Sequence, residues 1–357
     1  MQVNLVGFDY INEKEKRLVE RFLYSSEEKK YILGINKYTK SIAKEVAIDG
    51  IIDDFTRVQS SRKKEILQIE DVPKDALILS TASGSPLEIK KSLDALGYEN
   101  FNYLSLYKYG TLQLPDPMFM ADFKEDFLNN KAEYEKSYHL LFDEESKRIF
   151  EKVLNFKITY DFRFMQGFTN NHEAQYFDKD IIPNIKNIRF VDGGAYVGDT
   201  LQEIIKNYPD YEKIYCIEPN NLHINIAKRE FGELKNIEFI NCGLSDTTTT
   251  VEQFQEAQNN CDHNYQALQT DTLDNLIKDR VDYIKLDIEG AEQAALKGAK
   301  QTILKSHPIL AVCIYHQAQD WYKVPQIVLG IRADYDVYLR HYMEGIYETV
   351  LYFLPKK

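Results

Sequence analysis

The chain has 357 residues, which is enough for two domains or for one large domain with a substantial hydrophobic core. Its 56 acidic residues outnumber the 44 basic ones, and the net charge of -12 argues against nonspecific binding to nucleic acid or to an anionic membrane, because both need a basic surface. No apolar run approaches the length of a membrane span, and the first residues lack the pattern of a signal peptide, so we expect a cytoplasmic protein without a membrane span.

The first part of the chain alternates strand and helix patterns. We expect helices over NKYTKSIAKEV and over SPLEIKKSLDALGY, where Pro86 near the start and Gly97 at the end are typical helix boundaries. Strands that alternate with helices predict a parallel, Rossmann-like sheet, and we assign residues 1–106 to such an α/β domain. The expected strands lie in KKYILGI, IDGIIDDF, DALILSTAS and FNYLSL.

Residues 107–165 change to charged stretches with helical periodicity. The segments FKEDFLNNKAEYEKSYHLLF and EESKRIFEKVLNF predict two helices. We interpret this region as a helical connector between two α/β units; the alternative, that these helices pack on either sheet, stays open.

Residues 166–357 form the second α/β unit. Strands are expected in IRFVDGG, KIYCIEPN, IEFINCGLSD, VDYIKLDIEG and PILAVCIYH. Helices are expected in DTLQEIIKNY, in NLHINIAKREFG and, without a break, in AEQAALKGAKQTILKSH. Two further strand-like runs, YDVYLRHY and ETVLYFLP, are joined by MEGIY with Gly345, which predicts a terminal β-hairpin.

A glycine-rich turn, VDGGAYVGDT, follows the first strand of the second unit and precedes a helix. Glycines let the backbone approach a ligand, and the helix start presents free N–H groups. These groups suit the carboxylate of S-adenosylmethionine (SAM), and Asp192 can accept from its ammonium group. The spacing also approximates the dinucleotide fingerprint G-x-G-x-x-G, so an NAD site stays open. The candidate cofactor-binding residues here are Asp192, Gly193, Gly194, Ala195, Gly198 and Thr200.

Acidic residues follow two later strands. Glu218 comes 24 residues after Gly194, where a carboxylate can accept from both ribose hydroxyls of either cofactor. Asp287 lies in IKLDIEGAE, where a strand runs into a helix, and ligands of doubly wound sheets bind at that end of the strands. Hydride transfer has no obvious need for this acid cluster, whereas methyl transfer to a hydroxyl can use Asp287 to position or deprotonate the acceptor. The cluster therefore favours SAM over NAD.

His316 ends the run PILAVCIYH and is the second candidate for a catalytic base, because histidine titrates near neutral pH. The alternative is a lone histidine that is hydrogen-bonded to the backbone. We expect Lys285 to pack away from the site. We assign no metal, because the carboxylates of Asp287 and Glu289 are weak support for a divalent ion and no cysteine pair has CxxC spacing.

Taken in this order, the motifs resemble the FkbM-type methyltransferase family. The matching segments are VDGGAYVGDT, IEPN, INCGLSD, LQTDTLDNL and IKLDIEGAEQAALKGA, and the likeness extends over residues 175–355. The resemblance implies a class I SAM-dependent methyltransferase with a Rossmann-like fold, whose last strand inserts antiparallel between its neighbours. It also implies O-methylation of a sugar or a related small-molecule or glycan acceptor, such as a precursor of a bacterial surface polysaccharide.

The resemblance further implies residue roles. Asp192, Gly194 and Glu218 would contact SAM, and Leu244 and Ser245 would lie near its adenine. Tyr176 belongs to the segment EAQYF, which looks like the part that covers the cofactor in similar proteins.

Residues 29–106 more weakly resemble the N-terminal Rossmann-like domain of sugar-modifying enzymes, which can bind a nucleotide-sugar. The turn after the first strand departs from that pattern, since Gly34 is its only glycine. A structural role and a ligand-binding role both stay open for this domain. Two other functions remain as alternatives for the whole chain: an NAD(P)-dependent oxidoreductase, and a non-catalytic nucleotide-sugar-binding protein.

Overall fold

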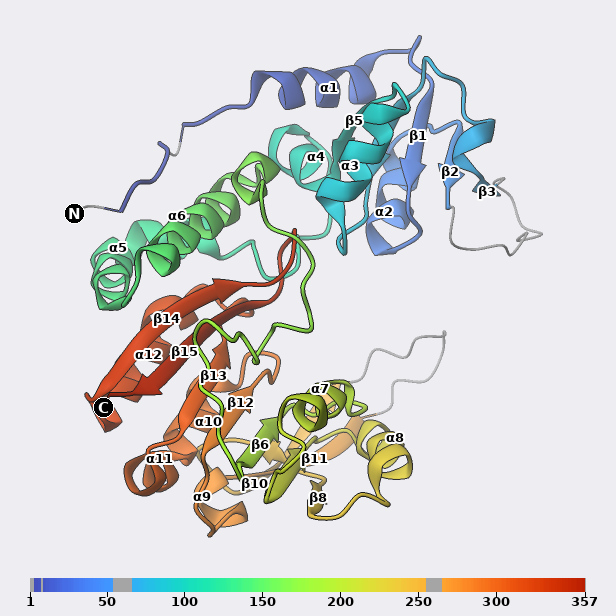
Figure 1. Cartoon of the computed structure of the whole chain (residues 1–357). Coiled ribbons are helices and arrows are strands. Elements are labelled where there is room, and N and C mark those ends of the chain that lie inside the picture. Colours follow the sequence, from blue (N-terminus) through green and yellow to red (C-terminus); the bar gives the residue numbers. More distant parts are fainter. Residues whose placement is uncertain (1–2, 8, 54–65, 255–264, 357) are drawn as a thin grey trace. The chain divides into compact units, whose positions relative to one another are not determined.

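The computed structural model describes residues 3–7, 9–53, 66–254 and 265–356 (Figure 1). The chain divides into two compact units. Unit 1 comprises Met1–Leu128, Phe150–Asn170 and Tyr342–Tyr347, and unit 2 comprises Asn129–Ile149, Asn171–His341 and Glu348–Lys357. Each unit is built around its own sheet.

Unit 1 contains a five-stranded parallel sheet with the strand order β3-β2-β1-β4-β5, which is the Rossmann-like arrangement that the alternating pattern predicts. Its core includes Ile52, Ile78, Leu93 and Tyr98. The strands are β1 (Lys30–Leu33), β2 (Gly50–Ile52), β3 (Ile66–Leu67), β4 (Leu77–Ser80) and β5 (Glu99–Asn102). The helices are α1 (Glu13–Tyr24), α2 (Lys37–Glu45), α3 (Pro86–Ala95) and α4 (Tyr103–Tyr109), with 3-10 turns η1 (Ile69–Asp71) and η2 (Phe162–Met165).

The expected strand FNYLSL is wrong after its second residue. Strand β5 ends at Asn102, and α4 begins at Tyr103. The side chain of Asn102 accepts hydrogen bonds from the N–H groups of Leu104 and Ser105, at 2.9 and 3.2 Å. This N-cap starts a helix inside an apolar run that otherwise suits a strand equally well.

The two helices expected between residues 107 and 165 are present as α5 (Phe123–Leu140) and α6 (Glu144–Thr159). Asn130 has non-helical dihedrals and kinks α5. The end of α5 and the start of α6 belong to unit 2, and the remaining parts belong to unit 1.

Unit 2 contains a seven-stranded sheet with the order β14-β15-β13-β12-β6-β7-β8. The strands from β13 to β8 are parallel, and β15 lies antiparallel between β13 and β14, as the predicted hairpin requires. The strands are β6 (Arg189–Gly193), β7 (Lys213–Ile217), β8 (Ile237–Ile240), β12 (Tyr283–Leu286), β13 (Ile309–Cys313), β14 (Tyr335–His341) and β15 (Thr349–Pro355).

The remaining elements of unit 2 surround this sheet. A small three-stranded sheet contains β9 (Gly243–Leu244), β10 (Thr249–Phe254) and β11 (Tyr265–Asp271). The helices are α7 (Asp199–Asn207), α8 (Asn221–Phe231), α9 (Leu273–Leu276), α10 (Glu292–Gly298), α11 (Lys300–Ser306) and α12 (Asp320–Ile331).

One expected helix is divided in two. The run AEQAALKGAKQTILKSH forms α10 and α11, with Ala299 in a non-helical conformation between them. Gly298 packs so closely on the backbone of Ser245 that a Cβ atom there would lie 2.0 Å from the Ser245 carbonyl oxygen. Tertiary packing therefore sets this break.

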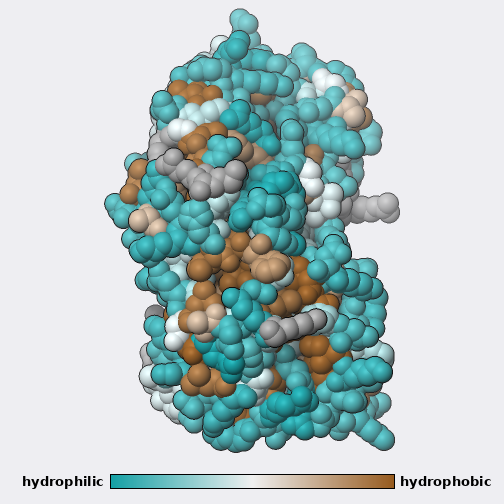
Figure 2. All heavy atoms as spheres, turned by 60° about the vertical axis from the view of Figure 1, so that its left-hand side comes forward, coloured by the Kyte–Doolittle hydropathy of each residue, from teal (hydrophilic) through white to brown (hydrophobic). Residues whose placement is uncertain are grey.

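Hydrophilic side chains cover most of the molecular face shown in Figure 2. Within the described ranges, every helix is too short or too polar to cross a membrane.

Candidate active site

A cavity of about 1010 Å³ opens in unit 2 at the carboxyl ends of β6, β7 and β12. This is the edge at which ligands bind in doubly wound sheets. Seven of the predicted site residues line it, namely Tyr176, Gly194, Thr200, Glu218, Leu244, Ser245 and Asp287. The other five, Asp192, Gly193, Ala195, Gly198 and His316, are buried and are not part of its lining.

The glycine turn forms one side of the cavity. Gly194 has a φ of +79°, and a Cβ atom there would lie 1.9 Å from the carbonyl oxygen of Asp287. Only glycine therefore lets the β6–α7 turn approach the turn after β12. Helix α7 begins at Gly198 without a side-chain cap, and Thr200 in its first turn lines the cavity. The first N–H groups of α7 are therefore available to a ligand.

Glu218 follows β7 and presents its carboxylate in the cavity wall. Its Oε1 accepts from the N–H of Asn220 at 2.8 Å, and its Oε2 accepts from the N–H of Tyr196 at 3.1 Å. His223 lies nearby, with Nδ1 3.7 Å from Oε1. Two backbone donors thus fix the orientation of a buried carboxylate that faces the cavity.

Asp192 is fully buried and pairs with Lys285, whose Nζ lies 3.0 Å from its Oδ1 and also donates to the Gly194 carbonyl oxygen at 2.8 Å. Burial alone would lower the pKa of Lys285, but the charges of Asp192 and Asp287 raise it above the usual value, so Lys285 remains a cation. The expectation that Lys285 packs away from the site is wrong, because Lys285 lines the cavity. Side chains two positions apart in an extended segment point to the same side of the sheet, so Lys285 and Asp287 both reach the cavity.

Asp287 lies just after β12, and two tyrosines hold its carboxylate. Tyr315 donates to Oδ1 at 2.9 Å, and Tyr176 donates to Oδ2 at 3.0 Å. Burial and the neighbouring Asp287 charge raise the pKa of both phenols, so both remain protonated donors. Tyr176, with a φ of 67°, comes from the segment EAQYF and lines the cavity. The orientation of Asp287 is thus fixed before any ligand binds.

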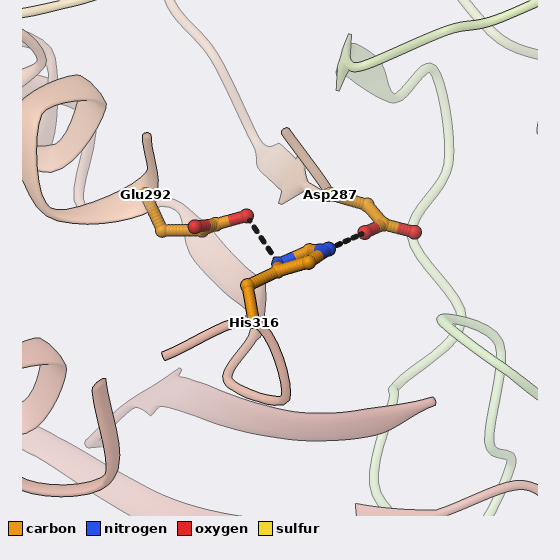
Figure 3. Close-up of side chains that lie close together, drawn as sticks. All are labelled: Asp287, Glu292 and His316. Carbon is orange, nitrogen blue, oxygen red and sulfur yellow. Dashed lines mark ion pairs between the residues drawn. The ribbon is translucent and has the colours of Figure 1, made fainter. Parts of the chain in front are cut away.

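His316 lies between two carboxylates, as Figure 3 shows. Its Nδ1 is 3.0 Å from Oε1 of Glu292, and its Nε2 is 3.6 Å from Oδ1 of Asp287 and 3.5 Å from Oε2 of Glu289. Burial by itself lowers the pKa of His316, but the hydrogen bond and charge of Glu292 and the charges of Asp287 and Glu289 raise it above its usual value. Strand β13 ends at Cys313, so His316 lies in the following loop and not at the strand's end.

Glu348 is a cavity residue that no sequence motif indicated. Glu348, which directly precedes β15, lines the cavity, and Gln175 donates its Nε2–H to Oε2 of Glu348. Burial and the charge of Asp287 raise the pKa of Glu348 to about 7. The backbone of Glu348 is in the left-handed region, with a φ of 63°. Only the predicted topology could have indicated that Glu348 reaches the cavity, because Glu348 precedes the strand that inserts antiparallel.

Two groups of side chains bring potential metal ligands within 4.8 Å of one another. In the group of Asp287, Glu292 and His316, the histidine is already ion-paired with both carboxylates. In the group of Asp287, Cys313 and Glu348, burial raises the pKa of the thiol well above its usual value, and thiols bind metals as thiolates. We assign no metal to either group.

Comparisons with known proteins concern the domain family and the fold of the chain. Residues 192–342 match the family model of the methyltransferase FkbM domain. The crystal structure of methyltransferase FkbM from Methylobacillus flagellatus KT aligns with 96% of this chain and 94% of that chain, with 22% sequence identity and a TM-score of 0.76. This likeness confirms the predicted fold class. No curated protein matches the chain.

Partial matches cover about half of the chain. An rRNA methylase from Streptococcus thermophilus aligns with 52% of this chain and 95% of its own, at 16% identity and a TM-score of 0.35. Fibrillarin from Aeropyrum pernix, solved with bound S-adenosyl-L-methionine, aligns with 51% of this chain and 73% of its own, at 11% identity and a TM-score of 0.36.

Proposed function

Because residues 192–342 match the family model of the methyltransferase FkbM domain, we propose that the chain is a SAM-dependent enzyme that methylates a hydroxyl group of a sugar or glycan precursor. The observation that carries the cofactor assignment is the carboxylate of Glu218, which two backbone N–H groups fix in the wall of a 1010 Å³ cavity. A carboxylate at the end of the second strand can accept hydrogen bonds from both hydroxyls of a ribose.

The residues present fit SAM along its whole length. Glu218 would hold the ribose, while Leu244 and Ser245 would lie beside the adenine. The start of α7 suits the methionyl carboxylate, because no side chain caps its first N–H groups. Asp192 supports the β6–α7 turn through Lys285, whose ammonium group donates to the Gly194 carbonyl oxygen. When bound, SAM supplies a methyl group activated by a sulfonium.

Methyl transfer is an in-line displacement, so this chain mainly has to align the acceptor. Asp287 would accept a hydrogen bond from the acceptor hydroxyl, since Tyr176 and Tyr315 hold its carboxylate at the cavity wall. His316 would act behind Asp287, where its Nε2 lies 3.6 Å from Oδ1 and helps to hold the carboxylate in place. A wall that carries Asp287 and Glu348 suits hydroxyl donors and disfavours anionic acceptors, which supports a neutral sugar.

Calorimetric titration with SAM, S-adenosylhomocysteine and NAD(H) tests this function. We expect both adenosyl ligands to bind and Glu218→Ala to weaken them at least 10-fold, because hydrogen bonds to a charged group contribute about 1.5–3 kcal/mol. Glu238→Ala is the matched control: Glu238 lies on the neighbouring strand β8, pairs with Lys213 and should leave affinity unchanged. Binding of NAD(H) alone would instead favour the oxidoreductase alternative.

The roles of Asp287 and His316 need a separate measurement. We expect Asp287→Asn and His316→Ala to bind S-adenosylhomocysteine yet to slow methyl transfer to methyl glycosides. Near-normal turnover in both variants, with the cofactor bound, would show that neither Asp287 nor His316 has a role in the reaction.

A further inference from the structure

The antiparallel last strand brings a new residue to the cavity. Because β15 runs opposite to β13, its first residues lie where β13 ends: Val350 pairs with Cys313, and Ile314 donates its N–H to the Thr349 carbonyl oxygen at 2.9 Å. Glu348 therefore reaches the carboxyl edge of the sheet, beside Asp287, although 61 residues separate the two in sequence. Carboxylate oxygens of Glu348 and Asp287 lie within 4.8 Å of each other.

The two neighbouring carboxyl groups have different surroundings. Both oxygens of Asp287 accept hydrogen bonds from tyrosine hydroxyls, and Nε2 of His316 lies 3.6 Å from its Oδ1. These partners hold the carboxylate of Asp287 in one orientation at the cavity wall. Burial and the negative charge of Asp287 favour the protonated form of Glu348, whereas the hydrogen bond that it accepts from the amide of Gln175 favours the ionised form.

We propose, on the basis of the methyltransferase function above, that Glu348 is the general base of the reaction and that Asp287 orients the acceptor hydroxyl. The acceptor oxygen forms its bond to the methyl carbon, and the carbon–sulfur bond of the donor breaks with its electron pair left on sulfur. The hydroxyl proton passes to the carboxylate of Glu348, which then releases it to solvent through the open cavity.

The protonation of Glu348 supports this role. Its pKa of about 7 lies near the value at which a general base is most effective at neutral pH. Burial is the largest cause, followed by the charge of Asp287, whereas the hydrogen bond from Gln175 and the charges of Lys285 and His316 act in the opposite direction. The titratable groups that face Glu348 are Lys285 and Asp287 from β12 and its turn, Cys313, Tyr315 and His316 from β13 and its loop, and Tyr176.

Proton release on SAM binding tests the proposal without a known acceptor. A base that serves the methylated oxygen lies about 6 Å from the sulfonium, and a positive charge at that distance lowers a carboxyl pKa by at least one unit. At pH 7, we therefore expect the wild type to release about 0.4 proton more on binding SAM than on binding S-adenosylhomocysteine, whose sulfur is neutral. Calorimetry in buffers of different ionisation enthalpy measures this difference.

Glu348→Gln should release equal numbers of protons on binding SAM and on binding S-adenosylhomocysteine. The variant should still bind S-adenosylhomocysteine with wild-type affinity, which would show that it is folded. Glu238→Gln, outside the cavity, should retain the difference between the two ligands. An equal proton release for both ligands in the wild type, or a difference that survives in Glu348→Gln, would overturn the assignment of Glu348. Failure of both ligands to bind the wild type would instead refute the proposed function itself.

Turnover gives a second readout. With methyl glycosides as acceptors, kcat/KM for SAM should rise with pH through about 7, as Glu348 ionises in the free enzyme, whereas kcat should rise at a lower pH because the bound sulfonium lowers the pKa of Glu348. Glu348→Gln should lower kcat by about 10²–10⁴-fold and lose this pH dependence, as expected for the loss of a general base. A normal kcat in Glu348→Gln would also contradict the proposal.

Discussion

The first β–α turn of unit 1 and that of unit 2 follow central parallel strands of their sheets, but they differ in which groups bind the first N–H groups of the helix. In unit 1, the side chain of Asn36 accepts from the N–H groups of Tyr38 and Thr39 and so caps α2. Asn36 also donates to the Thr81 carbonyl oxygen at 2.9 Å, which ties the turn to β4. In unit 2, α7 starts at Gly198 with no side-chain cap.

The start of α3 in unit 1 is occupied as well. Oε2 of Glu344 accepts from the N–H groups of Leu87 and Glu88, both at 3.1 Å, in the place where a helix would otherwise bind an anion. A cavity at this edge of unit 1 measures about 30 Å³, which holds little more than one water, against 1010 Å³ in unit 2. A doubly wound sheet thus offers a ligand site only where its own side chains leave the helix starts free. The contrast favours a structural role for unit 1.

Equivalent glycines give the sharpest test of this contrast. Gly194→Ala would place a Cβ atom 1.9 Å from the Asp287 carbonyl oxygen, and we expect at least a 100-fold loss of S-adenosylhomocysteine affinity by calorimetry. Gly34→Ala is the matched control. Gly34 has a φ of +102° and its Cβ would lie 2.9 Å from Thr81 Oγ1, so the change should destabilise unit 1 by about 1–3 kcal/mol and leave affinity unchanged.

Equal affinity losses in Gly194→Ala and Gly34→Ala would contradict the assignment of ligand binding to the unit 2 turn alone. Hydrogen exchange would separate the two effects, since only Gly34→Ala should lower protection in α2 and its neighbouring strands.

Buried charges make the two units respond oppositely to pH. In unit 2, burial raises the pKa of Asp320 to about 7, so this residue contributes stability below pH 4 that is lost as pH rises to about 7. In unit 1, burial lowers the pKa of Lys157 to about 7, so stability rises between pH 7 and pH 10.

Thermal unfolding between pH 4 and pH 10 checks these signs. The free energy of unfolding of Asp320→Asn, relative to the wild type, should rise by about 2–4 kcal/mol between pH 4 and pH 8. The free energy of unfolding of Lys157→Met, relative to the wild type, should instead fall as the pH rises above 7. The same pH trend in both variants would show that these two groups do not distinguish the units.

Glu344→Gln should have the smallest effect. The amide keeps an acceptor at the start of α3 but loses the favourable charge, so we expect unit 1 to lose about 1 kcal/mol in denaturant unfolding. S-adenosylhomocysteine affinity should not change. A large loss of cofactor affinity in this variant would mean that the start of α3 matters to the site in unit 2.

The sequence predicts the parts of the site that follow regular strands. Gly194, Glu218 and Asp287 each come directly after an apolar run, and parallel strands bring such positions to one edge. Asp192 and His316 were also expected at the cofactor or the acceptor, but which side chains face a cavity depends on packing. Asp192 pairs with the buried Lys285, and His316 pairs with the buried Glu292.

Other features depend on contacts between distant residues, which no local pattern carries. Glu348 reaches the cavity only because β15 inserts antiparallel, and Tyr315 reaches Asp287 from the loop after β13. The split between α10 and α11 follows from the contact of Gly298 with Ser245. Helix α4 depends on the cap at Asn102, and asparagine also fits a strand end or a turn.

The place of Glu344 in unit 1 has a consequence for the order of folding during synthesis. Leu87 and Glu344 are 257 residues apart, and between them the ribosome makes six of the seven strands of the unit 2 sheet. Helix α3 therefore emerges long before the carboxylate that caps it. Although N-terminal domains generally fold first, unit 1 reaches its final hydrogen bonding only after residues 342–347 have left the ribosome. The nascent chain thus completes its first unit late, when most of its second unit has already been made.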